Sequence, residues 1–153
     1  MWRQSNKLTK GSNQMLKVLV ACEESQTVCK AFRKRGHEAY SCDIMECSGG
    51  HPEWHIKGDV LPIINGYKTP TDIFITQDGF AHCVPKKWDL IIAHPPCTYM
   101  SKAGARFMYL TAGNVNQERF EKALQAKDFF MQFIIQISAA SSKWLSFDRC
   151  RQG

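Results

Sequence analysis

Apolar residues gather in short blocks along this chain, separated by polar and glycine-containing stretches. The first block, residues 16–21 (LKVLVA), has the length of a strand and is followed by the polar run CEESQT. From residue 25 to 35 the apolar residues recur on one helical face, which predicts an amphipathic helix that stops at Gly36. The next block, residues 37–43 (HEAYSCD), predicts a second short strand that ends at Asp43.

Strand, helix and strand therefore follow one another within about thirty residues, the span of a βαβ unit. Such crossovers are right-handed and join parallel strands, so we expect a parallel sheet with flanking helices, an α/β fold. Residues 88–93 (WDLIIA) are the clearest strand of the chain. Residues 73–80 predict a further short strand or a turn, and residues 42–59 predict a loop, because they contain several glycines and a proline.

A long helix is predicted after Asn116, whose side chain can cap the first turn. Six apolar residues share one arc of this helix, which we expect to pack on the sheet: Phe120, Ala123, Leu124, Phe130, Met131 and Ile134. The organisation we predict is a flexible leader over residues 1–14, one α/β domain over residues 15–137 and an irregular tail over residues 138–153.

Length, charge and cysteine content narrow the class of protein. A chain of 153 residues is long enough for one domain with a substantial core. Its formal net charge of +6 favours an anionic partner such as nucleic acid without identifying it. Seven cysteines, an odd number, and a polar opening without a secretory signal predict a reducing cytoplasm. No apolar run approaches the roughly 20 residues that cross a bilayer, so no membrane partner is expected.

The strand at residues 88–93 runs into His94, Pro95, Pro96 and Cys97. A proline removes a ladder N–H, so the two prolines must lie where the chain leaves the sheet. In open α/β sheets the carboxyl ends of the strands border the crevice in which ligands bind. Cys97 is therefore a candidate reactive thiol, although a buried and inert thiol is the alternative, because free cysteines are among the most buried residues.

Taken in order, these features resemble the cofactor-binding half of the DNA cytosine-5 methyltransferases, and especially the divergent phage and prophage proteins identified as DNA methylases. The resemblance covers roughly residues 15–136 and is most specific from Asp89 to Cys97, where a strand is followed by Pro-Pro-Cys. It implies a Rossmann-like sheet, S-adenosylmethionine as cofactor and DNA as partner. It also implies the cytoplasm of a bacterial or phage-infected cell.

By this resemblance Cys97 is the nucleophile, and Pro95, Pro96, Thr98 and Ser101 form the substrate loop around it. Addition of a thiolate to C6 of cytosine makes C5 carbanion-like, so that C5 accepts a methyl group. Because C6 is stacked inside duplex DNA, the target base must first be flipped into the site.

The cofactor residues follow from the first two strands. Asp43 lies about twenty residues after the first turn, the spacing at which dinucleotide folds place an acid on the ribose hydroxyls. The resemblance assigns Asp59, in the sequence GDV, to the adenine amino group. It assigns the first turn to the cofactor as well, namely Ala21, Cys22, Glu23 and Glu24. This turn departs from the family because it contains no glycine. Its two glutamates either meet the cofactor or begin the helix, where acids are favoured.

A second departure lies downstream. The family carries a glutamate, in a Glu-Asn motif on the next strand, that protonates N3 of cytosine, and no glutamate follows Glu121 in this chain. A target-recognition domain would also need more residues than remain. We interpret the chain as a truncated form, ended by a frameshift or a premature stop, whose activity the truncation puts in question.

Three other interpretations remain open. Cys42, Cys47, His51 and His55 have gaps near those of zinc ligands, although an ordinary loop explains them equally well, and we expect no metal. An amino-group methyltransferase would use His94 and the two prolines, but Cys97 stands where an aromatic should stack on the base, unless Tyr99 substitutes.

The third interpretation is a non-catalytic module that keeps the fold and binds DNA or a protein. Lys30, Arg33 and Lys34 form a basic helix face suited to such binding, although charged helix faces are usually only solvated. Fold alone does not decide between this module and an enzyme.

Overall fold

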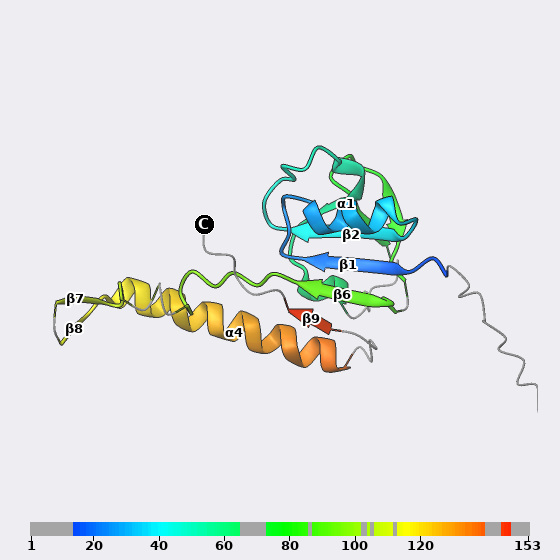
Figure 1. The fold of residues 1–153 in the computed structure, drawn as a ribbon. Coiled ribbons are helices and arrows are strands. Elements are labelled where there is room, and N and C mark those ends of the chain that lie inside the picture. The colour runs from blue at the N-terminus through cyan, green and yellow to red at the C-terminus, as the bar shows by residue number, and fades with distance from the viewer. Residues whose placement is uncertain are drawn as a thin grey trace, which may run out of the picture.

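The computed structural model describes residues 14–64, 73–85, 87–101, 104, 106–111, 113–139 and 145–147. At its centre is a five-stranded sheet with the order β3-β2-β1-β6-β9, in which every neighbouring pair is parallel (Figure 1). Its strands are β1 (Lys17–Ala21), β2 (Glu38–Asp43), β3 (His55–Lys57), β6 (Leu90–Ala93) and β9 (Leu145–Phe147). The predicted parallel sheet is confirmed.

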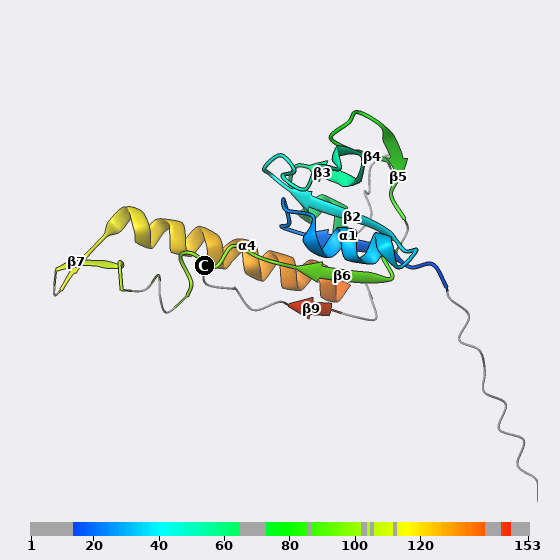
Figure 2. The ribbon, with the colours of Figure 1, turned by 45° about the horizontal axis from the view of Figure 1, so that its top comes forward.

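Helices cover both faces of this sheet, which gives the α/β architecture that the sequence predicts (Figures 1 and 2). The helical elements are α1 (Thr27–Lys34), the 3-10 helix η1 (Pro52–Trp54), α2 (Leu61–Ile64) and α4 (Gln117–Ala139). Two antiparallel hairpins form separate small sheets: β4 (Ile73–Ile75) with β5 (Ala81–Cys83), and β7 (Tyr109–Thr111) with β8 (Asn114–Val115).

The central strand, β1, divides the core into two layers because its side chains alternate between the faces of the sheet. Val18 and Val20 pack with Cys29 of α1 on one face. Leu19 and Ala21 belong to the larger cluster on the other face, which includes residues of α2 and α4. All four side chains are fully buried, as expected for a parallel strand covered on both sides.

The long helix, α4, begins as predicted but buries a different face. Asn116 Oδ1 accepts a hydrogen bond from the Arg119 N–H at 3.1 Å, which confirms the predicted cap. The expectation that the Phe120 arc packs on the sheet is wrong, because Phe120, Leu124 and Met131 are 41%, 46% and 49% exposed. The core instead contains Phe133 and Ile137, with Phe129 packed partly against it.

The reason lies in the position of the helix. Its C-terminal half lies beside the sheet, whereas its N-terminal half projects past the sheet edge (Figures 1 and 2). Phe129, Phe133 and Ile137 are spaced by four residues, so they form one stripe on the half that reaches the core. Of the predicted arc, Ala123, Phe130 and Ile134 are half-buried.

Several loosely predicted segments are now defined. The stretch 42–59 contains η1 and β3, and residues 73–80 contain β4 and the turn that leads to β5. The segment 138–153, expected to be irregular, contributes β9, which pairs with β6. Residues 1–13 of the expected leader lie outside the described residues. No helix in the described part of the chain is long and apolar enough to cross a membrane.

The substitution Phe133→Ala tests which face of α4 is buried. Phe133 is 0% exposed, so we expect its truncation to lower the free energy of unfolding by about 3–5 kcal/mol. Met131→Ala, on the exposed face two residues away, is the matched control and should cost less than about 1 kcal/mol. Urea denaturation followed by circular dichroism measures both. Equal losses for the two variants would contradict the orientation of the helix.

Candidate active site

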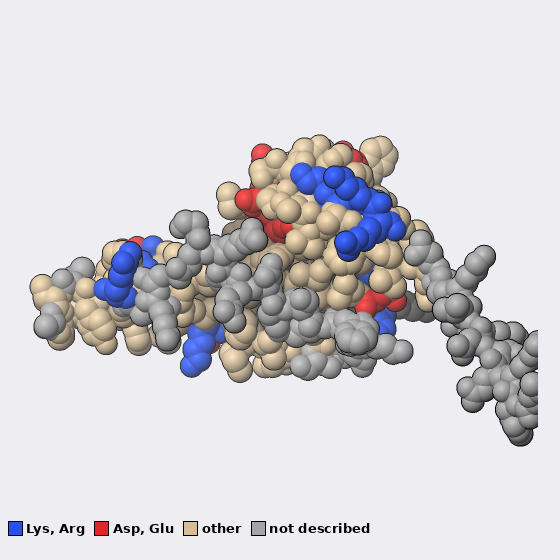
Figure 3. Space-filling model, viewed as in Figure 1, with Lys and Arg blue, Asp and Glu red and all other residues tan. Residues whose placement is uncertain are grey.

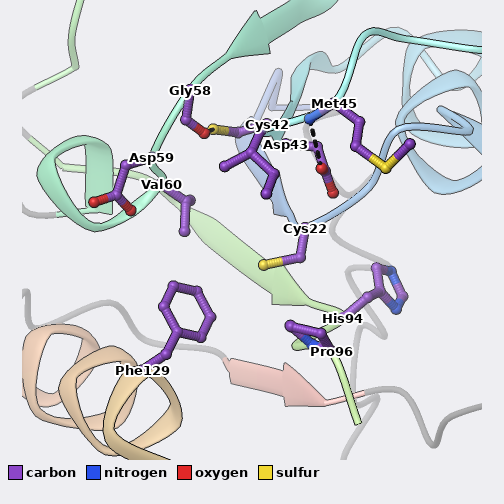
Figure 4. A pocket seen from close by; sticks show the side chains of 11 residues that line it. Cys22, Cys42, Asp43, Met45, Gly58, Asp59, Val60, His94, Pro96 and Phe129 are labelled. Atoms are coloured by element: carbon purple, nitrogen blue, oxygen red, sulfur yellow. Dashed lines mark hydrogen bonds between the residues drawn. The ribbon is translucent and has the colours of Figure 1, made fainter. Parts of the chain in front are cut away.

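A cavity of about 660 Å³ opens where the parallel strands end. Its described walls come from the end of β2, from the residues just after β1, β2, β3 and β6, and from Phe129 of α4. Figure 4 shows Cys22 between the ends of β2 and β3 on one side and Phe129 on the other. This volume is within the range of about 300–1,000 Å³ that is typical of small-molecule sites. The cavity lies at the edge of the sheet where the sequence predicted a site.

Two carboxylates, Asp43 and Asp59, line the cavity from the ends of neighbouring strands. Each is fixed by its own turn. Asp43 Oδ1 accepts a hydrogen bond from the Met45 N–H at 2.9 Å, and Asp59 Oδ1 accepts one from the Leu61 N–H at 3.0 Å. The residues that the resemblance assigns to the ribose and the adenine are therefore brought together at one cavity.

Burial and the two acids together raise the pKa of the thiol beside them. Burial, followed by the negative charges of Asp43 and Asp59, raises the pKa of Cys22 to about 12. The same three causes, together with Cys22 itself, raise the pKa of Cys42. Both thiols are therefore protonated near neutral pH and contribute apolar surface to the cavity rather than nucleophiles.

The first turn adopts left-handed backbone without glycine. Cys22 has a φ of 58° and Gln26 a φ of 57°. The turn is held to β2 by the Glu23 N–H, which donates to the Cys42 carbonyl at 3.2 Å. The buried Gln26 side chain donates from Nε2 to the His51 carbonyl at 2.7 Å. Hydrogen bonds to the neighbouring loop thus offset the backbone strain that glycine would avoid.

Glu23 begins the helix, one of the two roles that the sequence left open. Its Oε1 accepts from the Val28 N–H at 2.6 Å and its Oε2 from the Cys29 N–H at 3.2 Å. The carboxylate is 6% exposed and satisfies N–H groups in the first turn of α1. Glu24 accepts a hydrogen bond from Ser48 Oγ at 2.9 Å. Of the four turn residues predicted to meet the cofactor, Cys22 lines the cavity, while Ala21 is buried in the core.

The Pro-Pro-Cys segment borders the cavity. Pro96 is one of its lining residues, whereas Pro95 and Cys97 are half-buried next to it. The Cys97 carbonyl accepts hydrogen bonds from the N–H groups of Met100 and Ser101, both at 2.9 Å. The Cys97 sulfur is disulfide-bonded in this structure, so a nucleophile at this position requires prior reduction. Thr98 is exposed beside it.

The structure adds lining residues that sequence reasoning did not assign to the site. Ile44 and Val60 each follow one of the two acids directly, so their position at the strand ends could have indicated them. Phe129 reaches the cavity from α4, one turn before Phe133. It was not predicted as a site residue because a different face of this helix was expected to pack on the sheet. His94, considered only for an amino-group methyltransferase, also lines the cavity, and its buried Nε2 has no hydrogen-bond partner among the described residues.

The four residues with zinc-like spacing, Cys42, Cys47, His51 and His55, do not form a metal site in the described structure. His55 is bonded through Nδ1 to Ser41 Oγ and through Nε2 to the Met45 carbonyl, both at 2.9 Å. His51 stacks on Trp54, with 3.8 Å between the ring centroids. Among the described residues, no group of three or more His, Cys, Asp or Glu side chains is placed to hold a metal ion. The geometry favours the ordinary loop.

The basic face of α1 is largely occupied within the molecule. Lys30 Nζ donates to the Gly49 carbonyl at 3.2 Å, and Arg33 Nε donates to the Ala39 carbonyl at 2.7 Å. The Arg33 guanidinium also lies over the rings of Tyr40 and Trp54, each 4.9 Å away. Figure 3 shows Lys and Arg gathered on the rounded part of the molecule that carries α1. Lys30 and Arg33, two of the three basic residues that were predicted to suit binding of DNA or a protein, are therefore engaged in contacts within the molecule.

Comparison with known proteins leaves the chain without an assigned relative. No family model, no curated protein and no solved structure matches it. The features of the structure that bear on function are therefore the cavity, its two carboxylates and the loop that borders it.

The two possible roles of Glu23 are separated by the substitution Glu23→Ala. Loss of a carboxylate that caps α1 should lower the free energy of unfolding by about 1–2 kcal/mol, because buried N–H groups lose their acceptor. Glu24→Ala, which removes a partly exposed carboxylate from the same turn, should cost less. Denaturant unfolding measures both variants. A Glu23→Ala protein as stable as the parent would contradict the capping role.

Proposed function

We propose that this chain is a Rossmann-like, S-adenosylmethionine-binding protein of the DNA cytosine-5 methyltransferase class. One observation carries the proposal. Two carboxylates at the ends of adjacent parallel strands face a cavity that the Pro-Pro-Cys loop borders. The resemblance in sequence requires these residues to meet, although they lie far apart along the chain.

The chemistry of the cavity suits this cofactor. S-adenosylmethionine supplies an electrophilic methyl group on a positively charged sulfur. A cavity with two carboxylates and protonated thiols favours a cation over an anion. In the proposed complex Asp43 accepts hydrogen bonds from the ribose hydroxyls and Asp59 accepts one from the adenine amino group. Ile44, Val60 and Phe129 provide an apolar wall for the purine.

Cys97 is the proposed nucleophile once it is reduced. As thiolate, its Sγ would form a bond to C6 of a flipped cytosine while the electron pair of the C5–C6 double bond moves to C5. C5 would then take the methyl group from the sulfonium of S-adenosylmethionine, which would leave as the neutral thioether S-adenosylhomocysteine. Removal of the C5 proton then restores the double bond, and Sγ leaves as thiolate. The net charge of +6 supports DNA as the substrate.

The disulfide at Cys97 favours a second candidate function, a nucleotide-binding module without catalysis. Such a module would keep the cavity and its acids while its sulfur serves as a cross-link. Cofactor binding is common to both candidates, whereas attack on cytosine belongs to the first alone.

Calorimetric titration of S-adenosylmethionine into the purified chain tests the cavity. We expect measurable binding, and we expect Asp43→Asn to weaken it about tenfold or more, since hydrogen bonds to a charged group contribute roughly 1.5–3 kcal/mol. Asp128→Asn, which alters an exposed carboxylate on α4 by the same chemistry, should bind like the parent. Absence of binding, or equal loss in both variants, would overturn the cofactor assignment.

A DNA duplex that carries 5-fluorocytosine tests the nucleophile, because fluorine at C5 cannot leave as a proton and the adduct persists. With cofactor and a thiol reductant we expect a covalent complex that resists denaturation. Cys97→Ser should abolish it, since a serine hydroxyl is a far weaker nucleophile. The exposed thiol Cys83 gives the matched control, Cys83→Ser, which should form the adduct normally. Binding of cofactor without any adduct in the parent would favour the non-catalytic module.

A further inference from the structure

The side chain of Arg119 joins the loop that begins at Cys97 to α4. Its Nε donates to the Gly104 carbonyl and its Nη2 donates to the Thr98 carbonyl, both at 3.3 Å. One guanidinium therefore bridges two points of the loop, and one of them is the residue next to Cys97. Hydrogen bonds from a charged donor are stronger than those between neutral groups.

Aromatic rings surround the same guanidinium. Its central carbon lies 5.1 Å from the centroid of the Tyr99 ring and 5.3 Å from that of Phe107. Both distances are within the roughly 6 Å at which a cation is attracted to the face of a ring. Tyr99 belongs to the loop, and Phe107 follows it, so the stacking adds two further contacts between α4 and this segment.

The loop is closed tightly on itself. A Cβ at Gly104 would overlap the Thr98 carbonyl oxygen, so only glycine allows the two ends to approach this closely. The Gly104 N–H donates to Ser101 Oγ at 3.1 Å. Together with the two N–H groups that donate to the Cys97 carbonyl, these bonds make the described part of the loop a compact unit.

Arg119 is itself well anchored. Its N–H is bonded to the capping side chain of Asn116, and the C-terminal half of the same helix is fixed in the core by Phe133. The hydrogen bonds from Arg119 therefore hold the loop in a fixed position relative to the sheet at whose edge the cavity lies.

We propose that Arg119 is a positioning residue that holds the Cys97 loop in register with the cavity. This inference rests on the proposed function and names a residue outside the assigned site. Arg119 acts through the Thr98 and Gly104 carbonyls and touches neither cofactor nor base. A planar guanidinium can donate to both carbonyls while it stacks on rings, whereas the ammonium of lysine cannot reproduce this combination.

Two measurements on the reduced full-length chain test the proposal. The first is the rate at which iodoacetamide alkylates Cys97, followed by peptide mass spectrometry, and the second is the kcat and the cofactor KM of methyl transfer. We expect Arg119→Ala to accelerate the alkylation about tenfold, the change that loss of one charge-assisted hydrogen bond allows. We expect kcat to fall while KM is unchanged, because Arg119 is not among the cavity residues.

Four controls make the result specific. Lys122→Ala and Arg106→Ala each remove one exposed positive charge, the first from the same helix and the second from a cation stacked on Phe107, and neither should change the Cys97 rate. Arg119→Lys keeps the charge but should behave like Arg119→Ala. Cys29, which is buried and whose pKa is raised to about 12 by burial above all, should stay unmodified in every variant that remains folded.

An Arg119→Ala protein that is folded but alkylated at the parental rate would overturn the proposal, as would an equal acceleration in Lys122→Ala. If the parent transfers no methyl group, the proposed function fails, and the alkylation rates still decide the role of Arg119.

Discussion

The burial of β1 between β2 and β6 is the constraint on which the rest of the molecule depends. The strand is covered on both faces and hydrogen-bonded on both edges, so a shift of its register would expose apolar residues or break both ladders. In the observed register Ala21 lies opposite Cys42 and Ala93. The residues that follow these three positions, Cys22, Asp43 and His94, therefore lie at the same edge of the sheet.

The elements that could be predicted from the sequence are those whose residue pattern is compatible with a single kind of secondary structure. The run LKVLVA suits only a strand buried on both sides, and the Pro-Pro pair can stand only where a strand ends. The meeting of Asp43 with Asp59 was implied only by the family resemblance, because the strand that precedes Asp59 was predicted as part of a loop. The buried face of α4 could not be predicted in this way, because the helix carries apolar residues on both sides. Which side of the helix is covered depends on how far the helix projects beyond the sheet. The local sequence pattern does not contain this information.

Side-chain roles were harder to predict than side-chain positions. Glu23 was expected either to meet a ligand or to begin a helix, and a carboxylate near a strand end satisfies both descriptions. Only the positions of the Val28 and Cys29 N–H groups decide between them. The state of Cys97 is similar, since spacing along a chain does not reveal whether a sulfur is joined to another. For this chain, the sequence predicted the edge of the sheet at which the cavity lies, and the packing determines which side chains line it.

The turn after β1 shows that a left-handed backbone conformation does not require glycine. Cys22 and Gln26 hold conformations for which glycine is the usual choice, and hydrogen bonds to β2 and to the His51 loop keep them there. A fingerprint written as a string of glycines would pass over this turn, although its dihedral angles are of the kind that such a string is meant to detect. Distant relatives of chains like this one are better sought by torsion angles than by letters.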